Sequence, residues 1–173
     1  ISFKYVIEVF RFLQLLCEGH HLGLQDYLRE QNDNLRSVNA VKEVLLFFVE
    51  LVASFDAKDT ALLDQTLALL TEVCQGPCVG NQLLLVNYGV CNSLNTILTA
   101  PEFAVVTPYD CDRSVNMLQL KRSAITTVLS LLEGVRDESV PLTVLSEVPI
   151  AGLADLLEQF LNSPEFTAGN ENV

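Results

Sequence analysis

Cysteine and histidine side chains offer the most specific chemistry in this sequence. Cys74 and Cys78 flank a Gly-Pro pair, and Cys17 is followed closely by His20 and His21. Thiolate and imidazole groups at such spacings could bind zinc, and the two clustered cysteines could form a redox pair. Because Cys17 and Cys74 fall on apolar helical faces, we favour buried free thiols, and we predict no metal site and no cofactor.

The two histidines follow Gly19 at the expected end of a helix. A cation is stabilised at that end by the helix dipole, so we expect a capping role and keep pH sensing as the alternative. The carboxylates of Asp110 and Asp112 are expected in a solvated turn that caps the next helix, because they form no calcium loop.

No motif of a known catalytic centre occurs in the chain. The sequence lacks the nucleophile elbow of the hydrolases, the zinc-protease helix motif, the phosphate-binding loop and the dinucleotide fingerprint. With two histidines and no convincing pairing of a nucleophile with a base, we predict no catalytic residues and no enzyme activity.

Charge narrows the choice of partners. Twenty-two acidic residues against ten basic ones give a net charge of -12, which disfavours nucleic acid and anionic lipid as partners. Stretches 59–112 and 137–173 contain no Lys or Arg, which suits solubility or, alternatively, docking to a basic surface. No stretch of about 20 apolar residues exists, so we predict no direct membrane insertion by this segment. Five cysteines and no N-glycosylation signal indicate a reducing, intracellular compartment.

Apolar residues recur every three or four positions along most of the chain, which predicts helices rather than strands. We expect an all-α fold, an irregular armadillo-like solenoid or bundle of about seven to nine antiparallel helices. Residues 1–162 are expected to form one domain and 163–173 a disordered tail, the whole being a fragment of a much larger protein. The expected helices span residues 3–17, 22–30, 38–55, 60–74, 79–88, 90–98, 117–135, 140–145 and 150–160, with loops at 31–36 and 101–113.

A sharp corner is predicted between the helices that end at Cys74 and begin at Val79. Gly76 permits a left-handed backbone, and Pro77 prevents the helix from continuing. The side chains of Asn81 and Gln82 are expected to bind backbone groups left unpaired at the start of the next helix.

Three stretches resemble a known family. LQLLCEGH at 13–20 with LQDYLREQ at 24–31, LTEVCQGPCVGNQ at 70–82 and, more loosely, VLSLLEGVRD at 128–137 are similar to the domain associated with the homology region shared by inositol trisphosphate and ryanodine receptors. The double cysteine is closer to the inositol trisphosphate receptor branch. Gly19, Val73 and the apolar stretch 83–85 depart from the family pattern and indicate a divergent member. The resemblance assigns structural roles to Cys17, Glu18, His20, Gln25, Leu28, Gln31, Glu72, Cys74, Gln75, Gly76, Pro77, Cys78, Asn81 and Gln82.

The resemblance implies a cytosolic relay or scaffold domain of an intracellular ligand-gated calcium-release channel in the endoplasmic reticulum or another intracellular membrane. Its implied partners are the other domains and subunits of a homotetrameric channel. A triply phosphorylated ligand requires clustered Arg and Lys, and ten scattered basic residues do not supply that cluster, so we predict no ligand-binding residues here. The alternative is a generic helical-repeat adaptor for protein–protein interaction.

Overall fold

Hydrophobic residues spaced three and four apart produce eight α-helices and no strand in the part of the chain that the structure describes. The structure is a computed structural model, and it describes residues 3–54, 60–100, 111–135 and 137–148, with isolated positions between 152 and 158. The all-α prediction is confirmed. The helices are α1 (Phe3–Cys17), α2 (Leu22–Arg29), α3 (Ala40–Ala53), α4 (Thr60–Cys74), α5 (Val79–Asn87), α6 (Val90–Thr99), α7 (Cys111–Leu132) and α8 (Ser139–Glu147).

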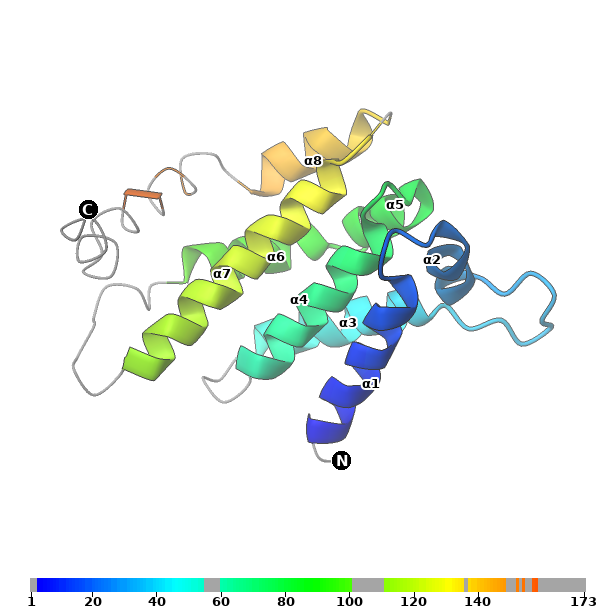
Figure 1. The fold of residues 1–173 in the computed structure, drawn as a ribbon. Coiled ribbons are helices and arrows are strands. Elements are labelled where there is room, and N and C mark those ends of the chain that lie inside the picture. Colours follow the sequence, from blue (N-terminus) through cyan, green and yellow to red (C-terminus); the bar gives the residue numbers. More distant parts are fainter. Residues whose placement is uncertain are drawn as a thin grey trace.

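The helices form an irregular two-layer bundle (Figure 1). Helices α1, α4 and α7 lie side by side, and α4 makes its most extensive contacts with these two neighbours. Helices α3 and α6 pack against each other in a second layer, and α3 also contacts α4. Helices α2 and α5 lie together at one end, and α8 contacts α5, α6 and α7.

Helix α4 lies at the centre of the hydrophobic core. Its predicted inward positions Leu63, Leu67, Leu70 and Cys74 are all fully buried. This burial follows from the position of α4 between α1 and α7, which leaves little of its circumference open. The same packing buries a hydroxyl pair, because Thr71 of α4 and Thr127 of α7 share a hydrogen bond of 2.8 Å.

Some helix ends differ from the sequence prediction. Helix α3 begins two residues later than expected, because the Asn39 side chain accepts a hydrogen bond from the Lys42 backbone N–H (2.8 Å) and caps the helix. Val38 therefore precedes the cap and is exposed instead of buried. Helix α7 begins at Cys111, so the last three residues of the loop expected at 101–113 are helical.

Two of the expected features lie outside the described residues, namely the tail at 163–173 and the carboxylate of Asp110. Most of the helix expected at 150–160 also lies outside them.

One of the two histidines plays a role different from the expected one. His21 caps the N-terminus of α2, where its Nδ1 atom accepts a hydrogen bond from the Leu24 backbone N–H (3.2 Å). His20 has a left-handed backbone with φ of +60°. The expectation of cationic capping at the end of α1 was wrong for His21, because the short connection makes His21 the first neighbour of the next helix.

The predicted corner between α4 and α5 is confirmed. Gly76 has φ of +93°, a conformation that side chains with a Cβ rarely adopt. A Cβ at Gly76 would collide with the Cβ of His20, and a Cβ at Gly134 would lie 2.6 Å from the Pro77 Cγ. The corner thus packs tightly against the α1–α2 connection and against the end of α7.

Replacing Gly76 by Val is expected to lower the free energy of unfolding by more than about 1 kcal/mol, because backbone strain adds to the collision with His20. Gly89 is the matched control. It also has a positive φ, of +85°, but no atom lies within 4 Å of a Cβ built there. Urea denaturation of both variants should show the larger loss at Gly76, and equal losses would remove the collision from the explanation.

Candidate functional site

Three buried amide side chains lie where the family-like stretches meet. Gln25, Asn81 and Gln82, here called the amide cluster, have exposed fractions of 1%, 0% and 1%. A buried amide without partners costs free energy, so its N–H groups must find acceptors inside the protein. Each of these side chains donates to two backbone carbonyls.

Two members of the cluster hold the end of α4. The Gln25 Nε2 atom donates to the carbonyls of Glu72 (2.6 Å) and Gln75 (2.9 Å). The Asn81 Nδ2 atom donates to the carbonyl of Val73 (2.7 Å) and to that of Gln25 itself (3.1 Å). The last carbonyls of a helix have no partner within it, so these amides satisfy acceptors that burial would otherwise leave unpaired.

Gln82 performs the same task for α7. Its Nε2 atom donates to the carbonyls of Ser130 (3.0 Å) and Glu133 (2.9 Å), at the end of that helix. Neighbouring residues of α5 therefore bind the ends of two different helices. The sequence prediction that Asn81 and Gln82 bind backbone groups was right, but the start of the next helix was the wrong location. Their side-chain N–H groups are donors, so they bind the unpaired carbonyls at the C-terminal ends of helices and not the unpaired N–H groups at the start of one.

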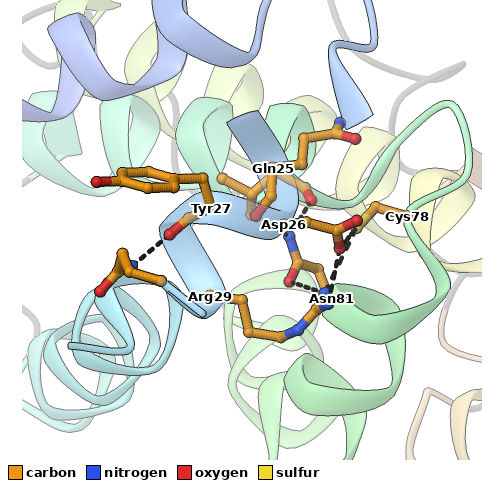
Figure 2. Close-up of polar contacts among 8 residues, drawn as sticks. Gln25, Asp26, Tyr27, Arg29, Cys78 and Asn81 are labelled. Carbon is orange, nitrogen blue, oxygen red and sulfur yellow. Dashed lines mark hydrogen bonds and ion pairs between the residues drawn. The ribbon is translucent and has the colours of Figure 1, made fainter. Parts of the chain in front are cut away.

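A charged group completes the cluster on the α2 side (Figure 2). Arg29 donates to the Oδ1 atom of Asn81 (2.8 Å) and forms an ion pair with Asp26 (2.7 Å). Its guanidinium also lies 3.7 Å from the Cys78 sulfur, which is 3.6 Å from Asp26. A Cβ at Gly80 would collide with this guanidinium, so the glycine makes room for Arg29.

Glu133 ties the end of α7 to the corner. Its carboxylate accepts a hydrogen bond from the Gly76 backbone N–H (2.8 Å). The corner is therefore bound by side chains from two other elements, Gln25 of α2 and Glu133 after α7.

Burial makes the nearby thiols poor nucleophiles at neutral pH. Cys17, Cys74 and Cys78 are free and buried, as the sequence predicted. Burial raises the pKa of the Cys17 thiol to about 11, and the carboxylate of Glu72 adds to the effect. It also raises the pKa values of Cys74 and Cys78. Within the described residues, no three His, Cys, Asp or Glu side chains form a group that could hold a metal ion.

The Glu72 carboxyl is held in an unfavourable environment. Its Oε2 atom is buried and has no hydrogen-bond partner. Burial raises the pKa of this carboxyl, and Glu18 raises it further. The Gln75 side chain and the nearby His20 act in the opposite direction without cancelling the rise.

The remaining family-like residues lie near the cluster or shape the chain beside it. Leu28 packs against the hydrophobic core, whereas Glu18 and Pro77 are exposed. Gln31 folds the loop between α2 and α3, because its Oε1 atom accepts from the Ser37 hydroxyl (3.2 Å) and the Val38 N–H (2.7 Å). Its Nε2 atom donates to the carbonyl of Tyr27, one turn earlier.

Sequence reasoning missed four residues of this site: Asp26, Arg29, Gly80 and Glu133. The spacing of Asp26 and Arg29, three positions apart on one helix, was a signal for an ion pair. For Gly80 and Glu133 no local signal exists, because their partners lie about fifty residues away along the chain.

The fold and the cluster define a class of protein, an all-helical domain in which three distant sequence stretches meet at one buried polar junction. The model of the family described as RyR and IP3R Homology associated matches residues 1–98. The match covers more than half of the chain, and the chain belongs to this family.

Two curated relatives agree with this family. The chain is 34% identical over 142 residues to the inositol 1,4,5-trisphosphate receptor itr-1 of Caenorhabditis elegans, across 76% of the chain and 5% of that relative. It is 30% identical over 99 residues to the inositol 1,4,5-trisphosphate receptor-like protein A of Dictyostelium discoideum, across 56% of the chain and 3% of that relative. The resemblance inferred from the sequence motifs is thus confirmed, including the inositol trisphosphate receptor branch. No helix in the described part of the chain has the length and hydropathy of a membrane span.

Asn81→Asp is expected to lower the free energy of unfolding by about 2 kcal/mol or more, because a carboxylate oxygen would face the carbonyls of Gln25 and Val73 in place of a donor. The control is Asn87→Asp, the same change at an exposed position of α5, which should cost no more than about 1 kcal/mol. Urea denaturation would contradict the assigned role if the two losses were equal.

Glu72→Gln is expected to raise the melting temperature at pH 7. The raised pKa means that the folded state holds the Glu72 proton more tightly than the unfolded state. The stabilising contribution of the protonated Glu72 carboxyl is therefore full below the ordinary glutamate pKa of 4.5 and is lost as the pH rises through its raised pKa in the folded state. The difference in melting temperature between the variant and the wild type should disappear near pH 4. The control Glu50→Gln, at an exposed site, should produce no such difference.

Proposed function

We propose that this domain is a non-enzymatic relay and scaffold element of an inositol trisphosphate receptor-like calcium-release channel. In this proposal it lies on the cytosolic side of the endoplasmic reticulum or another intracellular membrane, in a homotetramer. It couples ligand binding elsewhere in the polypeptide to the pore and does not bind that ligand itself. Membership of the family and the names of both relatives support the channel assignment.

The amide cluster is the observation that carries the relay role. A relay element must move as a unit, because a displacement at one end reaches the other only through rigid contacts. The cluster binds α2, the end of α4 and α5 to one another, and Gln82 extends these bonds to the end of α7. Bonds of this kind resist independent movement of the four helices, since breaking any of them leaves a buried polar group unpaired.

The charge distribution supports a coupling role over a ligand-binding role. Arg29 is a cation in direct contact with the cluster, and it is already engaged by Asp26 and Asn81. A phosphorylated ligand would need several free cationic side chains at one place.

The test uses the full-length protein that carries this chain, expressed in cells without inositol trisphosphate receptors. We expect inositol trisphosphate to release stored calcium from wild type and from Asn87→Asp. Asn81→Asp should bind the ligand with unchanged affinity but release little calcium. Gln82→Glu provides a second cluster variant in case Asn81→Asp accumulates poorly.

The outcomes separate the two parts of the proposal. Absence of ligand-evoked release from wild type would refute the channel assignment. Normal release by both cluster variants at normal protein levels would leave the channel assignment intact and refute the relay role of the amide cluster.

A further inference from the structure

Helix α1 carries two apolar faces, and the chain buries one of them. Phe10 and Cys17 point into the core, and the ring of Phe10 meets that of Phe47 edge to face at 5.5 Å. On another face, Tyr5, Val9 and Phe12 are 70%, 54% and 60% exposed. A helix that is apolar around most of its circumference is usually buried on more than one side. A second surface is therefore left open.

The spacing of the open face fits one kind of partner. Tyr5, Val9, Phe12 and the half-buried Leu16 follow one another at steps of four, three and four residues. Such steps place side chains in a straight row along one side of a helix, and this row fits the groove between the side chains of a second helix. We call this row, Tyr5, Val9, Phe12 and Leu16, the outer row of α1.

The arrangement of the bundle offers a place for that second helix. Helices α7, α4 and α1 lie in one layer, with α1 at its edge (Figure 1). The two flanks of α4 are occupied by α7 and α1. A helix along the outer row would continue the layer with the packing that α4 already has on both sides.

Charge argues against two other occupants. A net charge of -12 opposes binding of the row to an anionic membrane surface and opposes face-to-face pairing of two copies. On α1 itself Glu8 and Glu18 are exposed together with Arg11, so the repulsion between two copies comes from the net charge of the whole chain. A helix with neutral or basic residues beside its apolar face would not be repelled by the acidic chain.

We propose that the outer row of α1 is covered by an amphipathic helix of the same polypeptide, outside these 173 residues. The inference rests on the proposed function in one respect, namely that the chain is part of a much larger protein. The covering helix carries apolar residues at helical spacing toward Tyr5, Val9 and Phe12. It has neutral or basic residues beside Glu8.

Photo-crosslinking in the full-length protein tests the proposal. The residue p-benzoylphenylalanine replaces Phe12 in one variant and Glu50, exposed on α3, in a control. Mass spectrometry then identifies the peptide joined to each site. We expect Phe12, but not Glu50, to join a peptide of the same polypeptide with apolar residues three and four apart.

Several results would overturn the proposal. They are a lipid adduct, a crosslink between two α1 peptides, a crosslink to a different protein, or no crosslink at Phe12 when the full-length protein is folded. Thermal melting of the same variants in the 173-residue chain confirms that the exposed substitutions leave this domain folded. The readout is independent of calcium release, so failure of the channel assignment and failure of this contact are distinguishable.

Discussion

The donation of side-chain amide hydrogens to helix-end carbonyls is the constraint on which this structure depends. Helices that end inside a protein present carbonyls with no partner within the helix. Here α4 ends against α2 and α5, and α7 ends beside α5, so side chains of neighbouring helices reach these groups. Gln25, Asn81 and Gln82 supply the donors instead. The corner at Gly76, the space at Gly80 and the position of Arg29 all accommodate this arrangement.

Much of the fold was predictable from the spacing of hydrophobic residues, because the buried face of each helix is visible in the sequence of that helix alone. Leu63, Leu67 and Leu70 were placed in the core from their spacing alone, and they are fully buried. Predictions failed where a local polar group decided the outcome. Asn39 ended the loop after Val38, and His21 became the cap of α2. The spacing of hydrophobic residues does not indicate which side-chain acceptor a backbone N–H will bind.

The sequence motifs identified most residues of the site, but they did not predict which of these residues contact one another. Motif resemblance selected Gln25, Asn81 and Gln82, but the sequence did not show that they meet. Apart from Val73, which Asn81 binds from nearby in the chain, their partners lie about fifty positions away, so only the packing of α2, α5 and the two helix ends brings them together. Glu72 illustrates the same limit, because its burial depends on neighbours from several elements and raises its pKa in a way that no local pattern indicates.

The position of Asn81 and Gln82 side by side on α5 also affects how the domain opens. Helix ends ordinarily fray, each exchanging its amide hydrogens with water at its own rate. In this domain the ends of α4 and α7 are bound to adjacent residues of one short helix. Unwinding α5 therefore removes donors from both ends at once, with Gln25 of α2 still bound to the end of α4, and neither end can loosen without disturbing α5. The three helices share one cooperative unit of local unfolding, so small fluctuations there are suppressed and the junction opens as a whole.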